Sequence, residues 1–413
     1  MQLSRHLVLK ELIMDEDTPD SANASKPSRR KEGRKRPPET LKPGYVAAKI
    51  GTYFLGARYN DLRFGAQKRR FAGALPMGKK AAVYLIFPSQ GLLQSHLDSL
   101  GYIAAKGYAP VVVSNVPLRD ADRQRLLPHV ATYIERANFG YDFGGYRDGV
   151  LELQSELPQL ERLVLLNDSS WFPLPNGGDW IADAETIPCD YVGATAHYCF
   201  PMPAVSDFRS IKWNYDDGID FFHYTSFALM FGPAILRTPA FVKFWKSFPL
   251  TSIKRLTVRR GEVGLTKWVR AQGFTHGKTL DLSQFDKDLA QMPEQKLREM
   301  MAEMPVFAGD IQLLAIKQRL LDDAATHKSD LICFILTSVA RQGPSYALVE
   351  YLAFHRGFAF LKKSPCSLMA NSADIMRRVV ARLDGPLGDH IRAEAQDLFR
   401  KAPLADEIPA DLT

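Results

Sequence analysis

The sequence predicts an α/β protein built on a Rossmann-type, mostly parallel sheet flanked by helices, with a helical C-terminal region and a disordered basic N-terminal arm. From Lys79 onward, short apolar runs alternate with segments of helical spacing. Several runs are apolar at every position, which is typical of parallel strands buried on both faces. Beyond about Leu282 only helical spacing is found. The predicted regions are the arm (1–43), an amphipathic helical lead-in (44–78), the sheet domain (79–281) and the helical region (282–413).

The N-terminal arm is the most basic part of the chain. Residues 15–43 are rich in Asp, Pro, Ser, Lys and Arg and poor in large apolar residues, so we expect them to be disordered. Lys26 to Arg36 contains seven basic residues and one acidic residue. Such a balance favours anionic partners, namely nucleotide phosphates, nucleic acid or an acidic membrane surface. No zinc-finger, helix-turn-helix or RNA-binding signature accompanies it, so no specific nucleic acid is expected.

The lead-in from Gly44 to Phe71 has helical spacing with interleaved basic residues. It is expected either to pack on the main domain or to lie on a membrane surface. No run of about 18 apolar residues predicts a membrane-spanning helix, and the apolar patch near the N-terminus is too short for a secretory signal. The four cysteines include no C-x-x-C pair and are expected to be reduced thiols. We therefore expect a cytoplasmic protein, with the arm able to bring it to the anionic inner membrane.

Six apolar runs are the expected strands of the sheet. Ligands of such sheets bind at the carboxyl ends of the strands, so the loops after the third and fourth strands are the first candidates for a site. The expected strands are 81–87, 109–115, 130–136, 161–168, 190–196 and 225–232.

The loop after the third strand begins at Arg136 and contains Gly140, Gly144 and Gly145. Glycines allow backbone to approach a ligand closely, and the following helix offers unpaired N–H groups suited to phosphate. The Arg136 guanidinium suits the same anion. A tight turn that binds no ligand is the alternative interpretation.

The fourth strand runs directly into Asn167, Asp168 and Ser169. A carboxylate at the tip of a parallel strand can face a bound nucleotide or hold Mg²⁺ or Mn²⁺, which prefer oxygen ligands. The alternative is an Asx turn or helix cap without a ligand.

Glu262 follows Arg259 and Arg260 and is expected to open a helix that ends at Gly273. The helix dipole favours a glutamate in a first turn, and this alone could explain it. Near the strand tips, Glu262 could instead accept a proton from an acceptor hydroxyl. Three histidines near the same predicted edge are expected to be structural rather than metal ligands: His197, His223 and His276.

Several sequence motifs follow one another in an order that resembles that of a known protein family. The chain contains R-x-N-x-G-x-D, a buried strand ending in N-D-S, a T-S-F strand, a helix with F-W, and G-E-x-G-L. This order resembles the rhamnan synthesis protein F family, glycosyltransferases of bacterial rhamnose-containing polysaccharide and O-antigen assembly. The resemblance runs from about Ala81 to Phe274. It resumes at Tyr351 to Pro365, where HRGFAFLKKSP is similar to the family's box of the form G-F-P-F-x-K.

The layout is also similar to the GT-A glycosyltransferase fold, so a GT-A-like domain is expected. The resemblance implies that Asp168 stands at the metal-binding acidic motif and is catalytic, and that Glu262 is the base or orients the acceptor. The residues implied to bind the donor are Arg136, Asn138, Gly140, Asp142, Asn167 and Ser169.

The implied activity is that of an inverting hexosyltransferase. It would move a sugar, such as rhamnose or another deoxyhexose, from a nucleoside diphosphate sugar to a glycan or lipid-linked acceptor in lipopolysaccharide and O-antigen synthesis, with Mg or Mn as the divalent cation. The chain departs from the family pattern at Tyr141, where an arginine is common, and at Trp171 to Pro173, where G-P is usual. These departures keep open a non-catalytic carbohydrate-binding or polysaccharide-assembly protein on the same fold.

Overall fold

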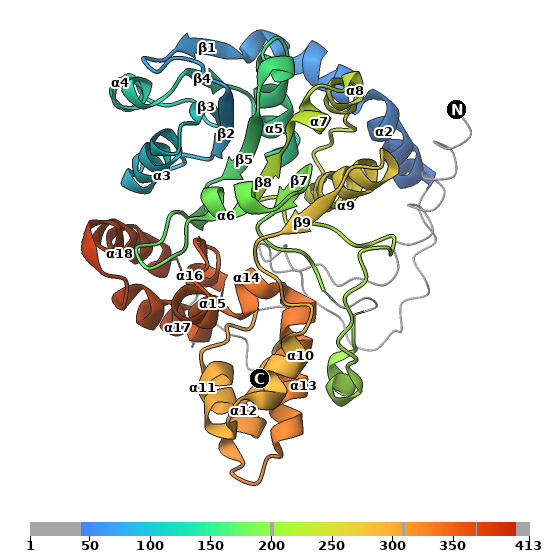
Figure 1. Ribbon diagram of the computed structural model, residues 1–413, viewed down its shortest axis with the longest axis vertical. Coiled ribbons are helices and arrows are strands. Elements are labelled where there is room, and N and C mark those ends of the chain that lie inside the picture. Colours follow the sequence, from blue (N-terminus) through green and yellow to red (C-terminus); the bar gives the residue numbers. More distant parts are fainter. Residues whose placement is uncertain (1–42, 199–201, 308–309, 369, 402–413) are drawn as a thin grey trace.

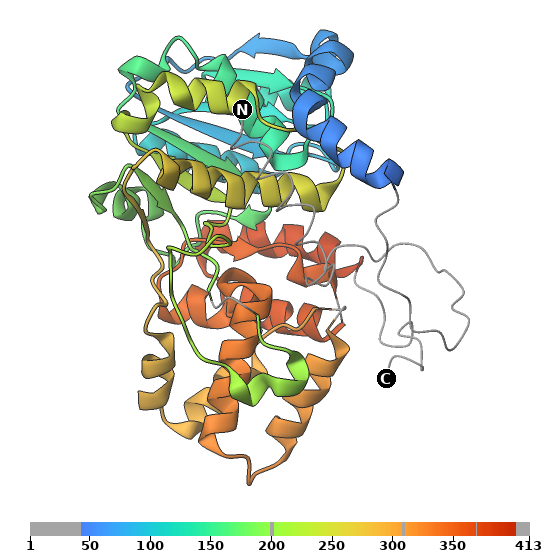
Figure 2. The ribbon, with the colours of Figure 1, turned by 90° about the vertical axis from the view of Figure 1, so that its right-hand side faces the viewer.

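A computed structural model describes residues 43–198, 202–307, 310–368 and 370–401. It has an upper layer built on a large sheet with helices on both faces, and a lower layer of helices (Figures 1 and 2). The predicted mixed α/β class is confirmed. The arm predicted to be disordered lies, up to residue 42, outside the described residues. No helix in the described part of the chain is long and apolar enough to cross a membrane.

The sheet has eight strands in the order β1-β4-β3-β2-β5-β8-β7-β9. The strands β2 to β5 are mutually parallel, whereas β8 runs antiparallel to both β5 and β7. Strand order reverses at β2, with β3 on one side and β5 on the other, so the crevice for a ligand is expected at the carboxyl ends of β2 and β5. The strands are β1 (Arg69–Ala72), β2 (Lys80–Ile86), β3 (Ala109–Ser114), β4 (Thr132–Glu135), β5 (Arg162–Asn167), β7 (Tyr191–Gly193), β8 (Ala228–Phe231) and β9 (His276–Lys278).

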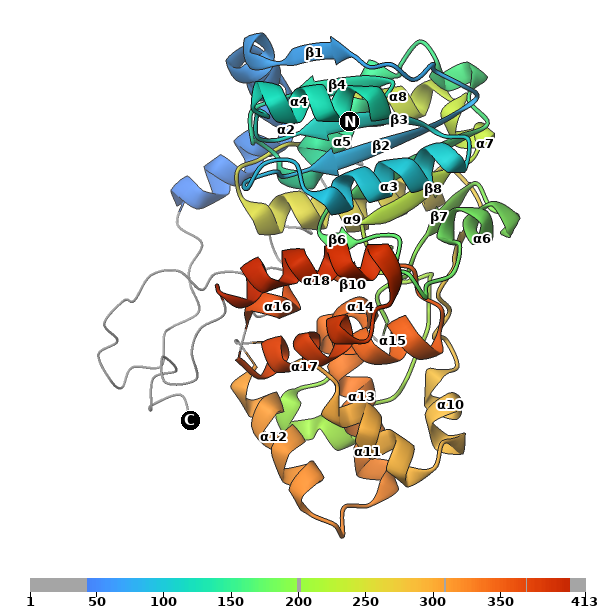
Figure 3. The same cartoon turned by 90° about the vertical axis from the view of Figure 1, so that its left-hand side faces the viewer.

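The predicted strands are confirmed. Their runs are apolar at nearly every position because the sheet is buried between two layers of helices. Helices α3 and α4 cover one face, and α5, α8 and α9 cover the other (Figure 3). The helices of this layer are α2 (Pro43–Phe64), α3 (Gln94–Ala105), α4 (Asp120–Leu126), α5 (Tyr141–Glu152), α6 (Trp180–Thr186), α7 (Pro233–Leu236), α8 (Pro239–Lys246) and α9 (Lys254–Ala271), with short 3₁₀ turns η1 (Gly65–Gln67), η2 (Leu127–His129) and η3 (Leu157–Gln159). The 3₁₀ turn η4 (Val205–Ser210) lies in the lower layer.

The glycines of α5 serve close packing of this helix on the sheet. A Cβ atom added at Gly145 would lie 2.3 Å from Cδ1 of Leu85, and one at Gly149 would lie 2.4 Å from Cγ1 of Val83. Gly140, just before the helix, has a φ of +81°, which favours glycine. The turn interpretation therefore accounts for Gly140, and packing accounts for the glycines that follow it.

Helix α2 packs on the sheet layer through one face. A Cβ atom at Gly56 would lie 1.9 Å from the Leu250 carbonyl oxygen, and Arg147 pairs with Asp61 at 2.8 Å. The expectation of helix up to Phe71 was wrong, since α2 ends at Phe64 and the following basic residues form the edge strand β1. Large apolar side chains remain exposed on the other face of α2: Phe54, Leu55, Tyr59 and Leu62.

The C-terminal helices form the lower layer, and one short strand ties them to the sheet layer. The prediction of wholly helical structure was wrong at β10 (Leu361–Lys362), which pairs antiparallel with β6 (Ser170–Trp171) directly after β5. An apolar cluster around Trp171 joins the two layers. The helices are α10 (Phe285–Gln291), α11 (Glu294–Ala302), α12 (Ile311–Asp322), α13 (Lys328–Gln342), α14 (Pro344–Ala347), α15 (Val349–His355), α16 (Pro365–Leu368), α17 (Ala370–Ala381) and α18 (Gly385–Phe399).

Candidate active site

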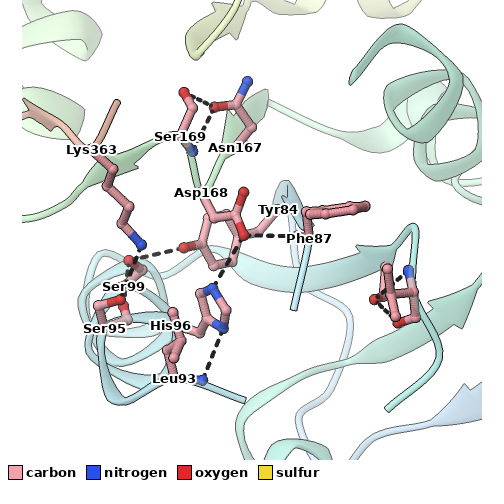
Figure 4. Close-up of polar contacts among 12 residues, drawn as sticks. Tyr84, Phe87, Leu93, Ser95, His96, Ser99, Asn167, Asp168, Ser169 and Lys363 are labelled. Carbon is pink, nitrogen blue, oxygen red and sulfur yellow. Dashed lines mark hydrogen bonds and ion pairs between the residues drawn. The ribbon is translucent and has the colours of Figure 1, made fainter. Parts of the chain in front are cut away.

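Asp168 lies at the point where strand order reverses, immediately after β5. Its Oδ2 accepts a hydrogen bond from the N–H of Phe87, the residue after β2, at 2.7 Å. The same oxygen lies 3.2 Å from Nε2 of His96 on α3 (Figure 4). The carboxylate therefore bridges the carboxyl ends of β2 and β5, where the topology predicts a ligand crevice.

His96 is fully buried and holds Asp168 in place. Its Nδ1 lies 3.2 Å from the backbone nitrogen of Leu93 and accepts that N–H, so the ring hydrogen is on Nε2 and is donated to Asp168. Burial by itself would raise the pKa of Asp168. The hydrogen bond from His96, the charge of Lys363 and the N–H of Phe87 outweigh burial and hold that pKa below its usual value. Asp168 is thus an anion at neutral pH.

The second oxygen of Asp168, Oδ1, has no hydrogen-bond partner among the described residues, and the side chain is 18% exposed. No group of three or more His, Cys, Asp or Glu residues in the described segments is arranged to hold a metal ion. Mg²⁺ is commonly bound through one or two carboxylates together with substrate phosphates. Asp168 fits one ligand of such a site, and the divalent cation stays a prediction.

Asn167 links Asp168 to the first turn of α5. Its Nδ2 donates to Oδ2 of Asp142 at 3.2 Å, and its Oδ1 accepts from the N–H and the hydroxyl of Ser169 at 3.2 and 2.6 Å. The local geometry is thus an Asx turn, as the alternative interpretation expected. Burial, and next the charge of Asp168, raise the pKa of Asp142 to about 6. A second carboxyl group therefore lies close enough to Asp168 to feel its charge.

Glu262 reaches the same edge from α9. Its Oε1 accepts from the N–H and the hydroxyl of Ser226, at 2.9 and 2.8 Å. The next residue, Phe227, accepts a hydrogen bond from the Asn167 N–H through its carbonyl, so Glu262 lies beside the end of β5. Oε2 of Glu262 lies 3.8 Å from Nε2 of His223. The prediction that Glu262 opens a helix was wrong, because α9 begins at Lys254; a first-turn dipole effect does not explain this residue.

Arg136 is buried, and none of its hydrogen bonds to the described residues goes to Asp168. Its guanidinium donates to Asp148 at 2.6 Å, to Asn115 at 2.6 Å and to the Phe139 carbonyl at 2.7 Å. It lines a cavity of about 420 Å³ between α2 and α5, together with residues such as Lys68. These contacts hold the loop before α5 in shape, and the predicted contact of Arg136 with phosphate stays a prediction.

The structure therefore divides the predicted site residues into two groups. Asn138 is exposed in its loop, and its side chain makes no hydrogen bond to the described residues, whereas Gly140 is buried against Leu250. Their predicted roles in donor binding stay predictions. The residues that lie together around the carboxyl end of β5 are Asp142, Asn167, Asp168, Ser169 and Glu262.

Two lysines at this edge were missed as site residues. Nζ of Lys362 donates to Oγ of Ser169 at 3.0 Å, and Nζ of Lys363 donates to Oγ of Ser95 at 3.4 Å. Both belong to the segment HRGFAFLKKSP, whose similarity to a C-terminal family box was noticed from the sequence. That box was the signal that could have found them, but no local pattern says which distant strand it joins.

An α/β sheet with clustered carboxylates at the reversal of its strand order defines a class of ligand-binding proteins whose site lies at the strand tips. The family model described as rhamnan synthesis protein F matches residues 110–327, more than half of the chain. The chain belongs to the rhamnan synthesis protein F family.

A curated bacterial protein and a yeast enzyme of solved structure are similar to parts of this chain. The protein named "Uncharacterized protein y4gN" from Sinorhizobium fredii is 33% identical over 202 residues, which is 49% of this chain and 49% of that relative. The chain thus spans about half the length of this curated relative. The mannosyltransferase Ktr4p of S. cerevisiae is 10% identical, with a TM-score of 0.23 over 46% of this chain and 65% of that one. Its complex with GDP gives a TM-score of 0.24 over 54% and 74%. At TM-scores this low, the similarity supports no conclusion about this chain.

Proposed function

We propose that this protein is a glycosyltransferase of bacterial surface polysaccharide synthesis, including that of O-antigen. It moves a deoxyhexose such as rhamnose from a nucleoside diphosphate sugar to a glycan or lipid-linked acceptor. The observation that carries the proposal is the convergence of Asp168 and Glu262 on the crevice at the end of β5. Family membership over residues 110–327 supports it.

In the proposed reaction, the acceptor oxygen bonds to the anomeric carbon as the bond from that carbon to the diphosphate oxygen breaks. The electron pair of the broken bond leaves with the nucleoside diphosphate, and the acceptor proton passes to Oε2 of Glu262. Attack from the side opposite the diphosphate inverts the anomeric centre. Oε1 of Glu262 is held by Ser226, so the carboxylate is fixed before substrate binds.

Asp168 is proposed to orient the donor through Oδ1, by accepting from its hydroxyl groups or by holding a cation that its phosphates share. A divalent cation, when bound, would neutralise charge on the diphosphate. Whether the enzyme needs this cation is tested together with donor binding.

The first prediction concerns donor binding. One of the UDP-, GDP-, dTDP- or CDP-linked sugars, tested with and without Mn²⁺, is expected to raise the melting temperature of the full chain. A ligand at 100 times its dissociation constant adds about 2.7 kcal/mol to the free energy of unfolding. The measurement is a thermal-shift panel. If no nucleotide sugar binds at millimolar concentration, the proposal fails and the carbohydrate-binding alternative replaces it, to be tested with glycans in the same assay.

We also propose that the protein makes peripheral contact with the anionic face of a membrane through α2. Four of the six large apolar side chains exposed in the described residues lie on α2, beside the exposed Arg58 and Arg63. An apolar face with flanking cations is suited to the headgroup region of an anionic bilayer. The basic segment Lys26 to Arg36 precedes this helix and adds to the attraction.

Leu62→Glu is accordingly expected to weaken binding to phosphatidylglycerol-containing vesicles about tenfold. Leu62 is 88% exposed, and burying a leucine contributes about 1.5–3 kcal/mol. The measurement is vesicle co-sedimentation at low salt. Met77→Glu is the matched control, because Met77 is also exposed but lies outside α2. Equal binding by the two variants, or no binding by the wild type, would refute membrane contact through α2.

A further inference from the structure

The short strand β10 places two consecutive lysines at the crevice, and they have different surroundings. Lys363 lies 3.7 Å from Glu394 of α18, and Glu394 also accepts from the N–H of Ser95 and from Nε1 of Trp171, each at 2.9 Å. The positive charge of Lys363 is therefore matched by Glu394, and this ion pair joins α18 to the sheet layer. In the part of the chain that the structure describes, Lys362 has no such ion-pair partner.

Lys362 is only 4% exposed. Within the described segments its ammonium donates one hydrogen bond, to Ser169, and it lies 3.9 Å from the ring centroid of Phe227 and 5.3 Å from that of Tyr346. Among the described residues, no carboxylate lies within 4.0 Å of it. A lysine has three N–H donors, so this buried cation is incompletely paired.

Several charges nevertheless face Lys362 from the elements around it. Asp142 on α5 and Glu262 on α9 act on it through space. Burial outweighs both and lowers the pKa of Lys362 to about 7. Asp168 directly precedes Ser169, the hydrogen-bond partner of Lys362, and Lys363 directly follows Lys362 in the chain. An ammonium buried without a close counter-ion is costly, and an anion entering the crevice would remove that cost.

We propose that Lys362 binds the diphosphate of the donor and holds the nucleoside diphosphate as it leaves. This inference rests on the proposed function and assigns the diphosphate to one side chain. As the bond to the anomeric carbon breaks, negative charge builds on the departing phosphate oxygen, and a positive group already in place stabilises it. The negative charge of the bound diphosphate favours the protonated form of Lys362, and the acceptor proton goes to Glu262.

The test compares affinity for a nucleoside diphosphate with affinity for its monophosphate by calorimetry, using the nucleotide selected by the thermal-shift panel. Lys362→Met is expected to weaken diphosphate binding about 30- to 100-fold and to leave monophosphate binding within about threefold. Lys362→Arg keeps a positive charge and is expected to recover most of the affinity. A general loss of structure would weaken both ligands together.

Lys317→Met is the matched control. Lys317 is also buried, at 6% exposed, but it donates to the carbonyls of Ala302 and Met304 among the C-terminal helices. Its replacement is expected to leave both affinities unchanged. If the wild type binds the diphosphate and Lys362→Met binds it equally well, the role of Lys362 is wrong while the proposed function stands. If no nucleoside diphosphate binds the wild type, both are wrong.

Discussion

Asp168→Asn is expected to lower kcat/KM for sugar transfer by roughly 10³-fold, about 4 kcal/mol of transition-state stabilisation. The asparagine oxygen can still accept from the N–H of Phe87 and from His96, so the local structure is kept and the negative charge is lost. The measurement is the rate of nucleoside diphosphate release from the sugar nucleotide found by the panel, with acceptor present.

Asp168→Ala separates this charge effect from an effect on stability. It removes the acceptor of two hydrogen bonds, so the free energy of unfolding is expected to fall by about 1–3 kcal/mol. The activity loss should match that of Asp168→Asn. Asp179→Asn is the control, because Asp179 caps α6 by accepting from the N–H of Ala182, and asparagine caps equally well. Activity of Asp168→Asn within threefold of wild type would exclude a role for the charge.

Glu262→Gln is expected to lower kcat by about 10²- to 10⁴-fold and to leave donor affinity unchanged. Glutamine keeps an oxygen that accepts from the N–H and hydroxyl of Ser226, so the side chain stays in place without a basic oxygen. The measurement pairs initial rates with donor affinity. Glu303→Gln is the control, since Glu303 pairs with Arg378 in the helical layer.

Asp142 is the competing base, and the same experiment distinguishes the two. Its pKa, raised to about 6 by burial and by the charge of Asp168, is near the pH at which a general base acts well. If Glu262→Gln keeps wild-type kcat while Asp142→Asn loses it, the assignment of Glu262 is wrong and Asp142 takes its place.

The sequence located the edge of the sheet that carries the site, because strand ends are a local property. The apolar run 161–168 stops at Asn167 and Asp168, and the structure has β5 end at Asn167. The sequence could not distinguish a glycine that binds a ligand from a glycine that allows close packing of a helix on the sheet. Gly145 was identified as a packing glycine only from the position of Leu85 against it.

Contacts between distant segments were decided by the tertiary structure alone. Ser169 and Lys362 are 193 residues apart, and Ser95 and Glu394 are 299 apart. Residue spacing predicts which face of a helix or strand is apolar, because that depends on neighbours a few positions away. Which strand β10 pairs with depends on the packing of the whole helical layer. The sequence by itself determined the fold class and the strand end at which Asn167 and Asp168 stand, and only the folded chain placed the buried Lys362 beside them.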